Sequence, residues 1–154
     1  MLRHAAPEKI LVLHGPNLNL FGRREPHIYG TMTLEQINER LRTLAAKVQV
    51  QLIIVQSNVE GVLVDTFHKH MDEVAGALLN PGGLTQSSVS LHDAIKAMPF
   101  PVIEVHMSNI AAREEWRHHS IISSAAKGTV QGLGWRSYTA ALRALVELIR
   151  ETSK

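Results

Sequence analysis

Short apolar runs alternate with segments of helical periodicity along this chain, and this alternation limits the possible folds more than any other feature. The apolar runs are residues 10–13, 52–55, 75–79, 101–105 and a weaker one at 128–131. Continuous apolar runs of this length are typical of strands that are buried on both faces of a parallel sheet. The spacing between the runs leaves room for a helix after each strand.

Apolar residues in the intervening segments recur every three or four positions, as they do on the buried face of a helix. The predicted helices cover residues 34–48, 59–71, 88–98 and 138–149. Thr33 and Gln36 form a capping box at the start of the first helix, and Pro99 follows the end of the third. Repeated β–α order predicts an α/β fold with a doubly wound, flavodoxin-like five-stranded parallel sheet, in three α/β/α layers.

Composition limits the class of protein. The chain has 154 residues, 45% hydrophobic and 19% charged, which is typical of one globular domain over residues 1–154, with residues 1–8 expected to be a flexible N-terminus. No apolar run approaches the roughly 18 residues that span a bilayer, and no basic block of the nucleic-acid-binding kind occurs. The absence of cysteine excludes disulfides, thiolate metal sites and cysteine nucleophiles, and it fits a cytoplasmic location. A net charge of +2 suits a small anionic ligand.

Ligands of such folds bind at the carboxyl ends of the strands, and the loop after the first strand is the strongest signal there. This loop, residues 14–30, is long for so small a domain and carries Asn17, Arg24 and Tyr29. A tyrosine is a poor base at neutral pH, but a neighbouring arginine, Arg23 or Arg24, favours the phenolate. The alternative is a tyrosine that packs the loop onto the core, and the loop alone leaves both interpretations open.

The fourth strand gives the second signal. Because side chains alternate along a strand, Glu104, His106 and Ser108 share one side near its carboxyl end. A glutamate in an apolar strand is costly unless it is paired, and a carboxylate that orients a histidine is a common acid–base arrangement. The alternative is that Glu104 and His106 form a buried structural pair without a role in catalysis. Their position at the ligand-binding edge of the sheet favours the catalytic interpretation.

Other features are weaker. Residues 80–83 lead into a helix capped by Ser87 or Ser88, which suits an anion, although a plain turn is the simpler explanation. His118 and His119 diverge by about 100° in a helix, so they suit one metal ion poorly. No lysine follows a strand at the ligand-binding edge, so we expect no Schiff base.

The chain carries several short motifs in the same order as one enzyme family does. The motifs are residues 15–19, 22–26, 28–30, 56–58, 60–61, 80–82, 103–106, 108–109, 112–114 and 117–120. They resemble the motifs of the type II dehydroquinases, the 3-dehydroquinate dehydratases, and the resemblance covers residues 9–149. It implies reversible elimination of water from 3-dehydroquinate, through an enolate, to give 3-dehydroshikimate. It also implies no metal, no cofactor and no Schiff base, and a homo-oligomer, a dodecamer assembled from trimers.

The resemblance also implies roles for individual residues. Tyr29 would remove the C2 proton, Arg24 would favour the phenolate, and Asn17 would hold a water on the enolate oxygen. His106 would protonate the departing C1 hydroxyl, and Glu104 would orient it. The implied substrate-binding residues are Asn80, Gln86, Met107, Ser108 and Arg117, with Asp93 reaching in from a neighbouring subunit.

The chain departs from the family pattern at Gln86, where most members have His, and at His92, Val59 and Ala111. We expect these departures to affect substrate affinity, substrate identity and subunit contacts rather than the type of reaction. Two other classes stay open: a weakly active homologue that binds a cyclic polyol acid, supported by Gln86, and a flavin or nucleotide binder, suggested by the fold alone. The resemblance does not distinguish aromatic biosynthesis from quinate breakdown.

Overall fold

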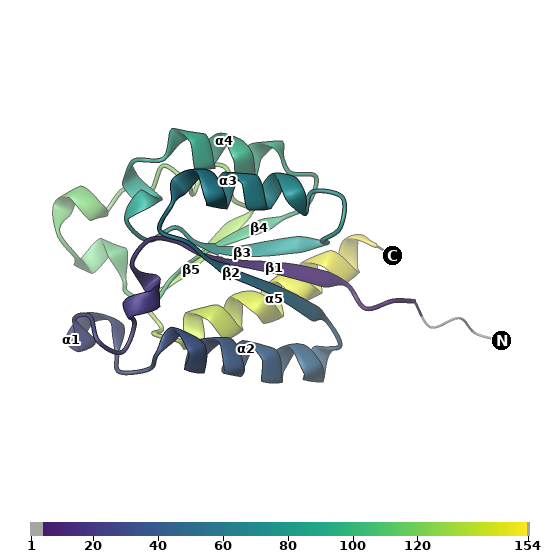
Figure 1. Ribbon diagram of the computed structural model, residues 1–154, viewed down its shortest axis with the longest axis horizontal. Coiled ribbons are helices and arrows are strands. Elements are labelled where there is room, and N and C mark those ends of the chain that lie inside the picture. The colour runs from purple at the N-terminus through teal and green to yellow at the C-terminus, as the bar shows by residue number, and fades with distance from the viewer. Residues whose placement is uncertain (1–4, 154) are drawn as a thin grey trace.

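A single parallel sheet forms the centre of the molecule (Figure 1). The computed structural model describes residues 5–153. The strands are β1 (Lys9–His14), β2 (Gln51–Gln56), β3 (Gly76–Asn80), β4 (Val102–His106) and β5 (Gly128–Gln131). They lie in the order β2–β1–β3–β4–β5, with every neighbouring pair parallel. This is the doubly wound, flavodoxin-like order, so the predicted fold class is confirmed.

Helices cover both faces of the sheet. They are α2 (Leu34–Val48), α3 (Glu60–Lys69), α4 (Val89–Ala97) and α5 (Arg136–Thr152). Figure 1 shows α3 and α4 on one face and α2 and α5 on the other. The predicted capping box is present, because Thr33 accepts from the Gln36 backbone and donates its own N–H to the Gln36 side chain. Ser88, one of the two predicted caps, accepts from the Leu91 N–H at the start of α4.

The core has two layers, one on each face of the sheet. Ile10 and Val12 of β1 pack toward α2 and α5, whereas Leu11 and Leu13 pack toward α3 and α4, and all four are fully buried. Central strands therefore match the sequence interpretation. The strand β2 differs, because it lies at an edge of the sheet and its apolar residues 52–55 are only partly buried.

The N-terminal segment enters the structure at the end of the sheet opposite α1 (Figure 1). Residues 1–4 of the segment expected to be flexible lie outside the described residues. Its last residue, Glu8, is held by two hydrogen bonds from the Arg150 guanidinium, and its carbonyl accepts from the Gln51 N–H. Within residues 5–153, no helix combines the length and hydropathy that a bilayer crossing needs.

The long segment after β1 is more ordered than a loop. It contains the short helices η1 (Leu18–Leu20) and α1 (Pro26–Tyr29). The rings of Phe21 and Tyr29 pack against each other with centroids 5.6 Å apart, which fastens α1 to the core. At the start of the segment, a Cβ on Gly15 would lie 2.6 Å from the Pro81 carbonyl oxygen, so glycine permits the close approach of the two chain segments.

Candidate active site

A pocket lies at the carboxyl ends of β1, β3 and β4, where the fold places its ligands. The residues that line it are Leu18, Phe21, Arg24, Tyr29, Asn80, Gly82, Gly83, Thr85, Gln86, His106, Met107, Ser108, Ile110, Arg113 and Arg117. Most of the site residues implied by the sequence are therefore brought together in one place. None of the lining residues is a lysine.

Tyr29, the last residue of α1, is buried at one side of this pocket. Its hydroxyl accepts a hydrogen bond of 2.7 Å from Nη1 of Arg113. The guanidinium of Arg24 lies 5.0 Å from the centre of the tyrosine ring, and that of Arg113 lies 5.2 Å from it. Two guanidinium groups therefore lie beside one phenol. The arrangement can therefore supply a tyrosine base.

Sequence reasoning assigned no role to Arg113, although it quoted the motif that contains it. The hydrogen bond to Tyr29 joins residues 84 positions apart, so no local pattern reveals it. His118 contacts the Arg113 carbonyl through Nε2, at 2.6 Å, and so fixes the backbone of this segment. Within the described chain, the Arg113 Nε is a buried side-chain donor without a hydrogen-bond partner. Such a donor at a pocket wall is suited to a ligand oxygen.

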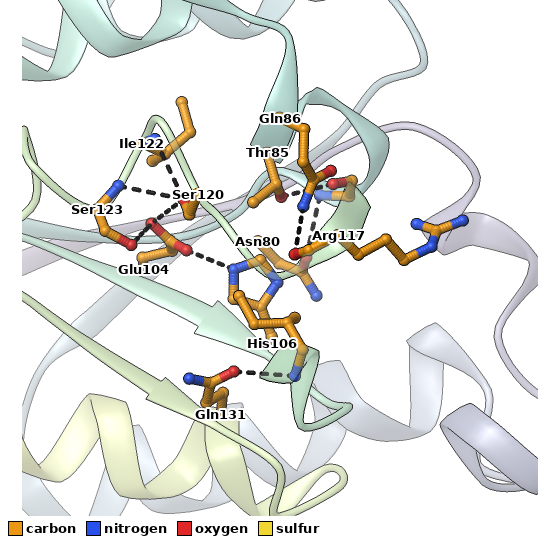
Figure 2. Close-up of polar contacts among 12 residues, drawn as sticks. Asn80, Thr85, Gln86, Glu104, His106, Arg117, Ser120, Ile122, Ser123 and Gln131 are labelled. Atoms are coloured by element: carbon orange, nitrogen blue, oxygen red, sulfur yellow. Dashed lines mark hydrogen bonds and ion pairs between the residues drawn. The ribbon is translucent and has the colours of Figure 1, made fainter. Parts of the chain in front are cut away.

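His106 lies at the end of β4, on the same side of the strand as Glu104 (Figure 2). Its Nε2 is 2.5 Å from Oε2 of Glu104, as the predicted alternation along the strand requires. Glu104 is fully buried, and its other oxygen accepts from the hydroxyls of Ser120, at 3.0 Å, and Ser123, at 2.9 Å. Because hydroxyl and imidazole donors surround it, the carboxylate is held in its acceptor role, and the Nδ1 of His106 stays available to the pocket.

Polar groups with fixed directions line the opposite wall. Asn80 accepts from the Gly82 N–H at 3.1 Å and donates to the Tyr138 hydroxyl at 3.0 Å. Gln86 donates from Nε2 to the Arg117 carbonyl at 3.0 Å, as Figure 2 shows. Amides oriented in this way can bind hydroxyl groups of a small ligand.

Comparison with known proteins agrees with this geometry. The family model described as dehydroquinase class II matches residues 8–146. The 3-dehydroquinate dehydratase of Halothermothrix orenii is 47% identical over 145 residues, which cover 94% of this chain and 98% of that protein. The chain belongs to the class II dehydroquinase family. It is therefore an enzyme of the hydro-lyase class.

Solved structures of class II dehydroquinases share the fold closely. The type II dehydroquinase of Propionibacterium acnes superposes with a TM-score of 0.89 at 38% identity, covering 94% of this chain and 99% of that one. The enzyme of Butyrivibrio crossotus gives a TM-score of 0.89 at 34% identity, covering 92% and 99%. The agreement extends over nearly the whole chain, including the segments that form the pocket.

Three residues that the family resemblance implicates lie outside the pocket lining: Asn17, Asp93 and Glu104, the last of which contacts the lining residue His106. Asn17 is exposed, directly before the lining residue Leu18, and its backbone has a φ of 69°. The Asn58 side chain accepts from the Asn17 N–H at 2.9 Å and so holds this turn. Asp93 lies on the exposed side of α4, where it accepts from the His92 ring at 2.9 Å. Asn17 therefore adjoins the lining residue Leu18 in the chain, and Asp93 lines a separate hollow.

The positions that depart from the family pattern differ in their relation to the pocket. Gln86 lines it. Val59 is 58% exposed at the start of α3, and Ala111 is exposed in a short turn after β4. His92 lies on α4 between Asp93 and Ser124. Gln86 is therefore the departure that bears directly on ligand binding.

His118 and His119 are the weak metal-site candidate that the sequence offers. Among residues 5–153, no group of three or more His, Asp or Glu side chains is arranged to hold a metal ion. His118 instead contacts a backbone carbonyl.

Proposed function

We propose that this dehydroquinase catalyses the reversible dehydration of 3-dehydroquinate to 3-dehydroshikimate, through an enolate and without a Schiff base. The observation that carries the proposal is that one pocket holds two groups able to transfer a proton. The Tyr29 hydroxyl accepts a hydrogen bond from a guanidinium, and the His106 ring contacts a buried carboxylate. Removal of a proton beside a ketone needs a base, and loss of a hydroxyl group needs a separate acid.

The first half of the reaction is proton transfer to Tyr29. Its phenolate takes the proton from C2, and the electron pair moves onto the ketone oxygen to form the enolate. Arg113 donates to the phenol and Arg24 lies over its ring, so two guanidinium groups lie beside the residue that takes the proton. Asn17, which directly precedes the lining residue Leu18, would hold a water against the enolate oxygen.

The second half is loss of the C1 hydroxyl. The enolate electrons re-form the ketone and place the new double bond between C1 and C2, and His106 gives its proton to the leaving oxygen, so that water departs. With Nε2 directed at Glu104, the proton comes from Nδ1. The buried carboxylate stabilises the imidazolium that must exist before the transfer. Acid and base come from different elements, β4 and α1, and we propose that they act on opposite faces of the substrate in an anti elimination.

Substrate contacts follow from the remaining wall of the pocket. We assign the substrate carboxylate to Met107 and Ser108, and the ring hydroxyls to Asn80, Gln86 and Arg117. Asp93 does not line the pocket of its own chain, and we propose that it contacts substrate in the pocket of another copy. This supports a homo-oligomer, which we propose to be a dodecamer assembled from trimers, and sedimentation velocity measures it directly.

The decisive experiment follows the ultraviolet absorbance of the conjugated enone after the purified protein meets 3-dehydroquinate. Turnover that survives borohydride and a chelator supports the proposal, because borohydride would trap an imine as a dead-end amine. No turnover by folded protein overturns it. Tyr29→Phe keeps the ring that packs on Phe21 and removes the base, so it should bind substrate but not convert it. Normal activity in that variant excludes Tyr29 as the base.

The cellular role is a separate part of the proposal. We propose a cytoplasmic enzyme that serves either aromatic biosynthesis or quinate breakdown. Deletion of the gene should abolish growth without aromatic amino acids in the first case, and growth on quinate in the second.

A further inference from the structure

A chain of buried polar side chains lies directly behind the pocket wall. Nε2 of His14 is 2.9 Å from Oδ1 of Asn38, and its Nδ1 is 3.0 Å from the Tyr138 hydroxyl. The same hydroxyl receives the hydrogen bond from Asn80, which lines the pocket. All four residues are less than 9% exposed, and His14 and Tyr138 are fully buried. They come from β1, α2, α5 and β3, so only the folded chain assembles them.

The direction of every hydrogen bond in this chain follows from one backbone group. The N–H of Gly82 can only donate, so the Asn80 atom that faces it is Oδ1, and Nδ2 faces Tyr138. The hydroxyl therefore accepts from Asn80 and donates its own proton to Nδ1 of His14. His14 then carries its proton on Nε2 and donates it to Asn38. Each member has its partner, and reversing any one of them leaves a buried group unpaired.

The position of His14 in the sheet explains why it acts on Asn80. The two residues are register partners at the carboxyl ends of the adjacent strands β1 and β3. His14 has no contact with the pocket itself, and it is the only polar side chain in a strand segment that is otherwise filled by apolar residues 10–13. An apolar residue would fill this site without the cost of burying an imidazole. The two hydrogen bonds of His14 therefore explain why a histidine occupies this position, whereas packing alone does not.

We propose that His14 is a positioning residue for the substrate: as the neutral Nε2–H tautomer it accepts from Tyr138, and thereby holds the Asn80 amide with its second N–H free for a substrate hydroxyl. This rests on the proposed function, in which Asn80 binds the substrate. His14 itself touches neither substrate nor reacting atoms.

The test compares variants that keep or remove the acceptor. His14→Leu removes it, so the Asn80 amide loses its fixed orientation, and KM should rise about tenfold, the value of one buried hydrogen bond, while kcat changes less than about threefold. His14→Asn places an amide oxygen near the position of Nδ1 and should restore most of the affinity. Tyr138→Phe removes a single oxygen, tolerates folding better, and should raise KM in the same way. In the double variant His14→Leu/Tyr138→Phe, KM should rise no further than in Tyr138→Phe, because both act through Asn80.

Two results would overturn the proposal. The first is a Tyr138→Phe or His14→Leu protein that is folded and has an unchanged KM. The second is a loss of kcat and thermal stability with no change in KM, the result of a purely structural role. Failure of the proposed function is recognised separately, because the wild-type protein would then not convert 3-dehydroquinate. In that case nitrogen NMR of His14 still tests the positioning chain without substrate, and protonation at Nδ1 would refute it.

Discussion

His14 should make the protein lose stability in mild acid, and the loss can be worked out from its burial. Burial lowers the pKa of His14 to about 4, against an ordinary value near 6.5 in the unfolded chain. At pH values between these two pKa values, His14 is protonated in the unfolded chain and neutral in the folded chain. Stability is therefore fully present above pH 6.5 and is lost as the pH falls toward 4. Linkage over this interval gives a loss of about 2.4 kcal/mol between pH 7 and pH 4.5.

Urea unfolding at fixed protein concentration, at half-unit steps from pH 7 to pH 4.5, measures this loss. His14→Asn is the matched control, because it keeps a polar group at the site and cannot titrate. The difference in unfolding free energy between wild type and His14→Asn should shrink by about 2.4 kcal/mol across the series. The pKa of Glu8 is lowered by its hydrogen bond from Arg150, and this contribution is the same in both proteins and cancels in the comparison. Parallel curves for the two proteins would refute the reasoning, since other titrating groups cancel in the comparison.

Three substitutions test the active site. Arg113→Met removes the donor to the Tyr29 hydroxyl, and loss of one charge-assisted hydrogen bond should lower kcat by about 10- to 150-fold; an unchanged kcat would show that Arg113 does not assist Tyr29. Glu104→Gln keeps the shape of the carboxylate but not its charge, so kcat should fall by a similar factor with KM nearly constant; full activity would show that orientation alone suffices. Gln86→Leu breaks the hydrogen bond to the Arg117 carbonyl, so KM should rise about tenfold. Gln86→His keeps a donor, so its KM should stay within about threefold of the wild-type value. Equal KM values for the two variants would show that Gln86 does not contribute to substrate binding.

The parts of the fold that the sequence predicts are those set by local rules. Apolar runs become the central strands because only residues such as Ile10 and Leu13 can be covered on both faces of a sheet. The capping box at Thr33 forms because its two hydrogen bonds lie within one helical turn. The position of Glu104 beside His106 follows from alternation along one strand. The partly buried β2 was not predicted, since the order of strands in the sheet decides which strand lies at an edge.

The parts that the sequence misses depend on contacts between distant segments. The hydrogen bond from Arg113 to Tyr29 needs α1 and the segment after β4 to meet, and nothing near either residue specifies that meeting. The chain behind Asn80 had a weak signal, because His14 and Asn38 interrupt apolar positions of a strand and a helix. A buried polar residue in such a position requires a partner, but the sequence does not say which one.

The two halves of the proposed chemistry are therefore built in different ways. The acid, His106, is held by a strand and by a carboxylate fixed by two serine hydroxyls, so its geometry follows from the sheet and from the buried cluster beneath it. The base, Tyr29, is held by α1 packing on Phe21 and by one hydrogen bond from a remote arginine. Local opening is easiest where few buried contacts hold a segment. The acid therefore depends on one strand that is buried along its length, whereas the base depends on a ring contact and a hydrogen bond between segments far apart in the sequence.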